Sequence, residues 1–335
     1  MGNCFTGPNK STAEISPCDC IKAVGSASVS ANPAAAAPVT AAVATTTVRL
    51  YGSPISMLTS YIRFALLYKA VPLRFVPSET TSETPTLQIG SETVSGTREK
   101  LLRFVDEKFP EPPLRMVKYN LEGFDETTPL IVRVTWLQHR SLIWHLHKMV
   151  RWAEDLSTRG GRKSVDPSVG TPTMELKKFG KSYSHLLDLM LEHAQMEERV
   201  LFPVLEMADR GICKSANQEH ARDLPVMNGI KEDIKSIVVL NSGSPAYREI
   251  LCNISARLKS LQERTKEHFE EEERDLLPLM EATGLSRDQQ RRLLDQCFDS
   301  MKGTHSHMFN SFLEGLLPRD AMQYLDLIMK FKDQE

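Results

Sequence analysis

The sequence contains one pattern twice, and this repeat constrains the fold more than any other feature of the chain. Residues 192–206 and 267–281 both fit E-H-x-x-x-E-E-R-x-L-[FL]-P-x-[LM]-E. In each copy a glutamate follows a histidine by four residues, which places both side chains on one face of a helix. Two such helices that face each other would bring two His/Glu pairs together, as a pair of bound metal ions requires.

Both copies continue a stripe of apolar residues at helical spacing. We expect helices at about 174–207 and 246–282, and the His and Glu of each copy replace core residues in the stripe. An unpaired carboxylate in a helical core carries a desolvation cost of several kcal/mol, whereas a bound metal ion supplies the compensating charge. One E-H-x-x-x-E pattern alone usually marks an exposed helix face, but two in phase with the core indicate metal ligands.

A histidine also lies in the helix that precedes each copy of the pattern. His139 and His220 both start further apolar stripes at helical steps. The order of His helix, His/Glu helix, His helix and His/Glu helix is the layout of an up-down four-helix bundle with two metals in its core. If Glu197 and Glu272 each bridge, every metal receives two histidines and two carboxylate oxygens. Nitrogen and oxygen ligands with open positions favour two iron ions, with other divalent metals such as manganese or zinc as alternatives.

This part of the chain, roughly 130–285, resembles the hemerythrin-like, or HHE cation-binding, domain family. The resemblance implies six metal ligands, which fall on His139, His193, Glu197, His220, His268 and Glu272. Oxygen-carrying hemerythrins have a further third-helix histidine where this chain has Leu224, so we do not expect an oxygen carrier of that type. The pattern is more similar to the bundles of eukaryotic iron-sensing ubiquitin-ligase components, although the six cysteines include no C-x-x-C pair that would suggest zinc modules.

Some alternatives stay open within this site. Glu198 and Glu273 each lie one residue beyond the chosen carboxylates and would replace them if the helices were rotated. The remaining histidines are interpreted as packed or surface residues, and the H-x-H pattern in 305–307 is a weak metal signal. These histidines are His145, His147, His185, His305 and His307.

Residues 48–118 show alternating strand and helix signals. We expect strands at 48–51, 73–76, 86–89 and 93–94, with helices at 56–70 and 97–109. The segment resembles the N-terminal thioredoxin-fold domain of glutathione transferases. The resemblance places the nucleophile-activating serine at Ser56 and the cis-proline turn at 84–87. It departs from the family at Thr97-Arg98, where a Glu-Ser or Asp-Ser pair would grip glutathione. We therefore expect a retained fold for packing or interaction, with Ser56 as a weak catalytic candidate.

The first 47 residues differ in composition from the rest. They are rich in Ala, Ser, Thr and Pro and poor in large apolar residues, which predicts a disordered tail. The sequence Met-Gly-Asn-Cys-Phe-Thr fits the myristoylation pattern at Gly2, with Cys4 placed for palmitoylation. A transit peptide and a chance Met-Gly start are the alternatives. Two acyl chains would hold the protein at a membrane as a peripheral protein.

Bulk composition limits the class of protein. The chain is 41% hydrophobic and 25% charged with a net charge of −2, so no nucleic-acid-binding surface is indicated. The cysteine usage fits a cytoplasmic protein, and plasma-membrane association would come from the acylated N-terminus. The predicted architecture is an α/β thioredoxin-like domain at 48–118, an all-α bundle at 130–285 and extra helices at 286–335.

These features favour a non-enzymatic metal-binding protein for iron or oxygen sensing, binding or storage. Its partners would be metal ions and O₂. The alternatives are a di-metal oxidase or peroxidase, a glutathione-transferase-like enzyme, and a scaffold that has lost its metal. The presence of competent residues at all six ligand positions argues against the last of these.

Overall fold

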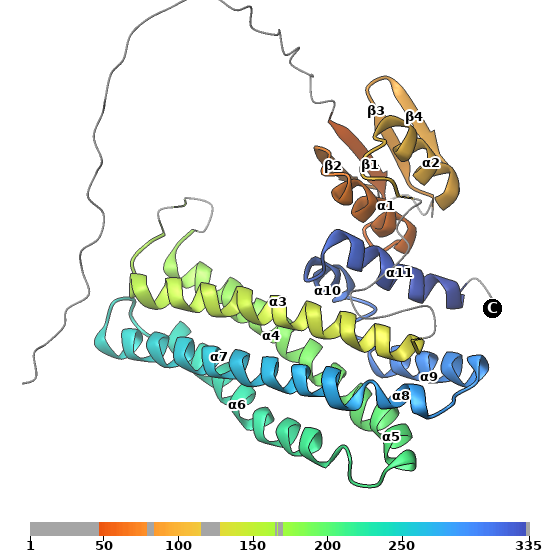
Figure 1. The fold of residues 1–335 in the computed structure, drawn as a ribbon. Helices are drawn as coiled ribbons and strands as arrows, with labels where there is room; N and C mark the ends of the chain where they lie inside the picture. The colour runs from red at the N-terminus through yellow and green to blue at the C-terminus, as the bar shows by residue number, and fades with distance from the viewer. Residues whose placement is uncertain (1–46, 79–83, 115–127, 165, 167–169, 333–335) are drawn as a thin grey trace, which may run out of the picture. The chain divides into compact units, whose positions relative to one another are not determined.

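Residues 48–108 form a four-stranded sheet with two helices. The computed structural model describes residues 47–78, 84–114, 128–164, 166 and 170–332 (Figure 1). The elements are β1 (Val48–Gly52), α1 (Met57–Tyr68), β2 (Leu73–Pro77), β3 (Thr86–Ile89), β4 (Glu92–Ser95) and α2 (Arg98–Lys108). The four expected strands are confirmed within a residue or two.

The sheet mixes parallel and antiparallel pairs in the order β2-β1-β3-β4. β1 is parallel to β2, and β3 is antiparallel to both β1 and β4. A parallel pair of adjacent strands needs a crossover connection, and α1 provides it. Val48 and Leu50 of β1 and Leu87 of β3 are fully buried, so these two strands supply the apolar centre of the sheet.

Residues 130–282 form a helical bundle. Its elements are α3 (Leu130–Arg159), α4 (Pro172–Met196), η1 (Glu197–Leu201), α5 (Phe202–Ala208), α6 (Lys214–Val238), α7 (Pro245–Glu271), η2 (Glu272–Leu276) and α8 (Leu279–Ala282). α3 packs against α4 and α7, and α6 packs against the same two helices, so the four long helices surround one core (Figure 1). The apolar stripes predicted from the sequence line this core.

The two repeated helices also begin alike. Thr171 caps α4 by accepting a hydrogen bond from the Met174 backbone, and Pro172 occupies the first turn. Ser244 caps α7 in the same way, followed by Pro245. A capping hydroxyl satisfies a free backbone N–H, and proline fits the first turn because its missing N–H is not needed there.

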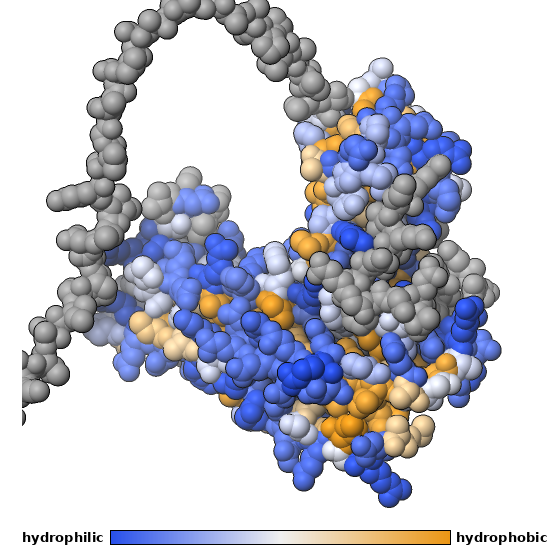
Figure 2. Space-filling model, viewed as in Figure 1, coloured by the Kyte–Doolittle hydropathy of each residue, from blue (hydrophilic) through white to orange (hydrophobic). Residues whose placement is uncertain are grey.

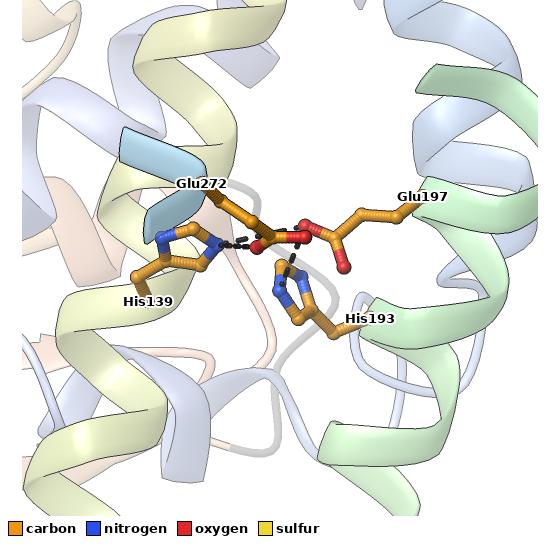
Figure 3. Close-up of side chains that lie close together, drawn as sticks. All are labelled: His139, His193, Glu197 and Glu272. Atoms are coloured by element: carbon orange, nitrogen blue, oxygen red, sulfur yellow. Dashed lines mark ion pairs between the residues drawn. The ribbon is translucent and has the colours of Figure 1, made fainter. Parts of the chain in front are cut away.

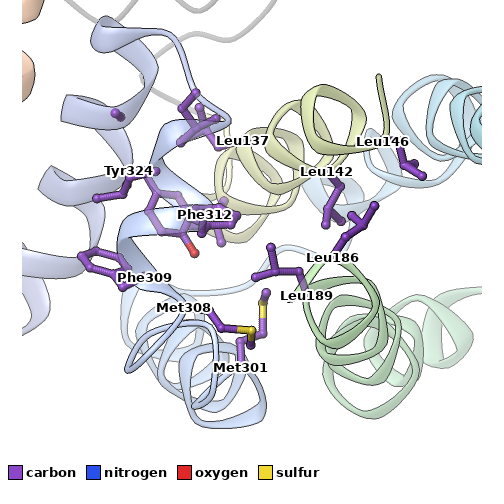
Figure 4. Packing of buried hydrophobic residues seen from close by; sticks show 14 of the residues in the cluster. Leu137, Leu142, Leu146, Leu186, Leu189, Met301, Met308, Phe309, Phe312 and Tyr324 are labelled. Carbon is purple, nitrogen blue, oxygen red and sulfur yellow. The ribbon is translucent and has the colours of Figure 1, made fainter. Parts of the chain in front are cut away.

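Three further helices, α9 (Arg287–Ser300), α10 (Phe309–Glu314) and α11 (Pro318–Lys332), follow the bundle. Figure 4 shows Phe309, Phe312 and Tyr324 packed together beside the side chains of α3 and α4. The Ser141 hydroxyl of α3 donates a hydrogen bond to the Phe312 carbonyl at 2.7 Å. These helices therefore extend the core of the bundle.

α11 also contacts the sheet region. Asp326 accepts hydrogen bonds from the Tyr61 hydroxyl at 3.2 Å and from the Arg98 guanidinium at 2.5 Å. In α10, the side-chain amide of Asn310 donates to the Pro54 carbonyl at 2.9 Å. These contacts join the two ends of the described chain.

The exposed surface in Figure 2 is mainly hydrophilic, with hydrophobic residues gathered over α5 and α8. Met207 of α5 is 82% exposed. Among the described residues, no helix is both long and apolar enough to cross a bilayer.

Candidate metal centre

Six side chains from the four long helices and the two short η segments meet in the bundle core. The histidines come from α3, α4, α6 and α7, and the glutamates from η1 and η2. They form two overlapping groups in which the ligand atoms lie within 4.8 Å of one another. His139 and His193 belong to one group and His220 and His268 to the other, while the two glutamates belong to both. The residues are His139, His193, Glu197, His220, His268 and Glu272, the six that the sequence predicts.

Figure 3 shows the first group, with His139 on α3 facing Glu272 while His193 and Glu197 approach from the opposite helix. The Nε2 atom of His193 lies 3.2 Å from Oε1 of Glu197. The Nε2 atom of His139 lies 3.5 Å from Glu197 and 3.4 Å from Glu272. Two ligand atoms each about 2.1 Å from one ion are about 3.0–3.4 Å apart at ordinary bond angles, so these spacings fit a shared ion.

The second group has the same spacing. His220 Nε2 lies 3.5 Å from Oε2 of Glu197, and His268 Nε2 lies 3.5 Å from Oε1 of Glu272. The two Nε2 atoms are 3.1 Å apart. Each glutamate thus turns one oxygen to each pair of histidines, the arrangement that two bridging carboxylates would have.

Six of the inward-facing atoms of this cluster have no hydrogen-bond partner. They are Nε2 of His139 and of His193 and both carboxylate oxygens of Glu197 and of Glu272, all of them buried. A buried polar atom without a partner is costly, and native proteins rarely leave several of them in one place. Six such atoms gathered in two adjoining ligand groups fit bound cations, because coordination would satisfy all of them.

Each of the four histidines is oriented by a partner at its outer nitrogen. Nδ1 of His139 lies 2.8 Å from Glu273, and Nδ1 of His220 lies 3.0 Å from Glu198. His268 pairs with Glu219 at 2.6 Å and His193 with the side-chain oxygen of Gln138 at 3.0 Å. A histidine that donates its Nδ1–H to an acceptor presents a bare Nε2 on the other side, which is the form that binds a metal.

The sequence prediction left Glu198 and Glu273 as rival ligands, and the structure places them outside the cluster. Both point to the outer nitrogen of a histidine rather than to the shared centre. Glu197 is fully buried and Glu272 is 3% exposed. The geometry therefore favours the first glutamate of each repeat as the inner carboxylate.

A wide helical turn begins at each inner glutamate. The Phe202 N–H donates to the Glu197 carbonyl and the Leu277 N–H to the Glu272 carbonyl, five residues back in both cases. Pro203 and Pro278 follow directly, and a proline lacks the N–H for the ordinary helical hydrogen bond and crowds the carbonyl four residues earlier. The shared proline of the repeat thus accounts for a π-type turn, a feature often found at functional sites. The prolines are part of the sequence pattern, but the wide turns were not predicted from it.

Electrostatic coupling within the cluster is strong. Burial opposes protonation of His139, but the neighbouring carboxylates Glu197, Glu272 and Glu273 raise its pKa well above the usual value. Burial lowers the pKa of His193, and Glu197 offsets this only in part. Burial alone would raise the pKa of Glu197, yet His193 and His139 hold it well below the usual value. Glu197 is therefore ionised and ready to bind a cation at neutral pH.

Residues 130–280 match the family model described as Hemerythrin HHE cation binding domain. This region of the chain is hemerythrin-like. The match covers all six cluster residues and supports metal-ion binding by this part of the chain. No curated protein and no solved structure matched the chain.

The other histidines have local roles. His145 is buried, and its Nε2 lies 2.8 Å from the Ser311 carbonyl. His305 lies between the Met301 carbonyl and the Tyr324 hydroxyl, while Ser306 pairs with His307. His305 and His307 thus have different partners, and neither belongs to a metal-ligating group found among the described residues.

The structure assigns helix-capping roles to the residues singled out in the sheet region. The Ser56 hydroxyl accepts a hydrogen bond from the Thr59 backbone at 3.2 Å, and Thr97 caps α2 similarly. Arg98 is paired with Asp326. Among the described residues the cis peptide bond lies at Glu111–Pro112 and not at Thr84–Pro85, which corrects the expected cis-proline turn. The lipidation residues Gly2 and Cys4 lie outside the described residues.

Two cavities are lined by residues of the cluster. One, of about 210 Å³, is lined by acidic residues that include Glu219, Glu271, Glu272 and Asp275. An acidic opening concentrates cations near its mouth, so this cavity suits metal entry. The other, of about 320 Å³, is lined mainly by apolar side chains and reaches His193, His220 and His268.

Proposed function

We propose that residues 130–285 form a hemerythrin-like four-helix bundle that holds two iron ions. His139 and His193 would bind one ion, His220 and His268 the other, and Glu197 and Glu272 would bridge both. The observation that carries this proposal is the set of buried, partnerless ligand atoms in two groups that share the glutamates. Manganese and zinc remain alternatives, because nitrogen and oxygen ligands accept them as well.

The chain's own residues prepare the site for binding. Glu198, Glu219, Glu273 and Gln138 hold the four imidazoles with Nε2 facing inward, which reduces the reorganisation needed to bind an ion. When bound, a pair of iron ions supplies redox and oxygen-binding chemistry. The bundle supplies a buried environment that limits the access of water to the ions.

The biological role that fits this arrangement best is sensing or storage of iron or oxygen in the cytoplasm. Without an ion the core contains unsatisfied polar atoms, so metal binding would stabilise the bundle and make its stability depend on metal supply. The ligand helix α3 also contacts the C-terminal helices next to His139. Arg140 pairs with Asp320 at 2.8 Å, and Ser141 bonds to the Phe312 carbonyl. A metal-dependent change in α3 would therefore reach α10 and α11.

For the sheet region we propose a thioredoxin-like fold at 48–118 that serves packing or interaction. The parallel β1–β2 pair with its crossover helix, followed by antiparallel β3 and β4 and by α2, supports this fold. Arg98, at the start of α2, pairs with Asp326 of α11. We also propose a tail at 1–47 and C-terminal helices at 286–335, from the composition and spacing of the sequence. Acylation at Gly2 and Cys4 would attach the tail to a membrane.

The metal content of purified full-length protein tests the main proposal. Protein produced in iron-rich medium should contain about two equivalents of metal per chain. The His193→Ala/His268→Ala double variant removes one histidine from each group and should contain little. His147, which is exposed on α3, provides a matched control as His147→Ala. Less than one equivalent in the wild type, together with equal content in the double variant, would refute the proposal.

A further inference from the structure

The inner end of the larger cavity is formed by three of the candidate ligand histidines. It is bounded by His193, His220 and His268, but neither Glu197 nor Glu272 lines it. It shares His268 with the acidic cavity, whereas Glu272 lines only the acidic cavity. Beyond the histidines the walls are mainly apolar, with Leu142, Met190 and Met227 among the lining residues.

The two copies of the repeat differ at a residue that lines this cavity. The residue after the motif histidine is Phe269 in the second copy and Ala194 in the first. The Phe269 ring stacks on His139 with centroids 3.9 Å apart and planes within 3°. Ala194 has no ring to place at the corresponding position, and both Ala194 and His220 line the cavity. On the third helix, Leu224 lines the cavity and is 39% exposed, so the cavity reaches the surface there.

Size and chemistry indicate what would fill the cavity. A volume of about 320 Å³ holds about ten non-hydrogen atoms, at roughly 30 Å³ for each water-sized group. The apolar walls favour a hydrocarbon chain. Two divalent ions carry more positive charge than the two inner glutamates neutralise, so an anionic oxygen donor suits the inner end. The acidic residues on the walls already have partners, since Glu198 pairs with His220 and Asp223 with Arg264, both at 3.0 Å.

We propose that this cavity binds a medium-chain monocarboxylate of about eight carbons, with its carboxylate at the metal centre and its chain along the apolar walls. The site rests on the proposed metal binding, because the ions supply the charge that holds the head group. The preference for a chain of about eight carbons follows from the volume of the cavity. Small inorganic anions would meet the ions but leave the apolar space unfilled.

Calorimetric titration of the iron(II)-loaded full-length chain under argon tests the proposal with butanoate, hexanoate, octanoate and decanoate. The dissociation constant should fall about fourfold for each added methylene up to octanoate and then level off, because each buried methylene contributes a constant increment. Octan-1-ol should bind at least tenfold more weakly than octanoate. Equal affinities for butanoate and octanoate, or for octanol and octanoate, would overturn the proposal.

Variants distinguish ligand binding in the cavity from binding of the metal ions. Ala194→Phe gives the first repeat the ring that the second repeat has. This variant should abolish the gain in affinity with chain length while the iron content stays unchanged. Leu224→Trp, at the exposed end, provides a second obstruction should Ala194→Phe fold poorly. Gln218→Phe adds a ring to an exposed position of the same helix as Leu224, outside the cavity, and should retain the gain. If the two obstructing variants keep the gain, the ligand does not use this cavity. Iron measured in each sample distinguishes this failure from a wild-type chain that holds no iron, which would overturn both proposals.

Discussion

Nδ1 of His139 lies 2.8 Å from Oε1 of Glu273. Glu273 therefore orients a candidate ligand instead of competing with Glu272 to be one. Loss of such an outer partner typically costs 10- to 100-fold in metal affinity, according to measurements on other metal sites. We expect Glu273→Ala to weaken iron binding by about that factor and Glu273→Gln, which keeps an acceptor oxygen, to weaken it less.

The control for this prediction is Glu270→Ala, at an exposed position near the end of α7, directly before η2. A competition titration against a chelator of known affinity measures both variants. If Glu273→Ala matches the control, the contact to His139 has no role in binding. If it removes all bound metal, Glu273 is itself a ligand and the assignment of Glu272 fails.

Metal binding should raise the free energy of unfolding. An ion that binds only the folded chain adds about 4 kcal/mol at a free concentration about 1,000 times the dissociation constant. The Glu197→Gln/Glu272→Gln variant loses both inner carboxylates and should gain almost nothing from the same metal concentration. Urea unfolding with and without iron measures the difference, and an equal gain in both proteins would place the stabilising ion elsewhere.

Metal binding should also release a proton from the cluster. The carboxylates Glu197, Glu272 and Glu273 raise the pKa of His139 well above the usual value despite burial, which favours the protonated imidazole when no ion is bound. Coordination requires the neutral ring, so the proton must leave and affinity must rise with pH. Calorimetry in buffers of different ionisation enthalpy should show about one proton released from this group. A binding enthalpy independent of the buffer would contradict the prediction.

His145 should make the protein sensitive to acid. Burial lowers its pKa to about 4, and Lys148 contributes while the bond to the Ser311 carbonyl opposes the shift. Between pH 6.5 and 4 the unfolded chain binds a proton that the folded chain does not, so the free energy of unfolding falls as the pH falls through this range. A pKa that falls from 6.5 to about 4 corresponds to about 3 kcal/mol.

The variant that isolates this group is His145→Gln, whose amide can still donate to the Ser311 carbonyl. Over pH 7 to 4 the metal-free wild type should lose about 3 kcal/mol more stability than the variant. Both proteins carry the same carboxylates, so the effects of these other titrating groups on the free energy of unfolding cancel in the comparison. Parallel stability curves for the two proteins would show that His145 does not titrate as expected.

The centre of the bundle could be predicted because helical spacing is a strong constraint. His193 and Glu197 are four residues apart in a stripe that is otherwise apolar, and the repeat at His268 and Glu272 made coincidence implausible. The structure brings these four residues together with His139 and His220, as expected. The choice between Glu197 and Glu198 depended on helix rotation, which sequence periodicity fixes only within about one residue.

Other features could not be predicted because they depend on tertiary contacts. The sequence shows Thr97-Arg98 at the start of α2, where the transferase family has an acidic residue followed by serine. It does not show that Arg98 pairs with Asp326, because the two residues are far apart along the chain. The wide turns at Glu197 and Glu272 had a signal in the shared prolines, because a proline inside a helix displaces the hydrogen bonds before it.

Anomalous diffraction from crystals of the iron-loaded full-length protein, recorded at the iron absorption edge, tests the central claim most directly. We predict two anomalous peaks in the bundle core, one within about 2.3 Å of Nε2 of His139 and His193 and one equally close to Nε2 of His220 and His268. Both peaks should lie within bonding distance of Glu197 and Glu272. No peak among these six side chains, or peaks only at other residues, would contradict the account.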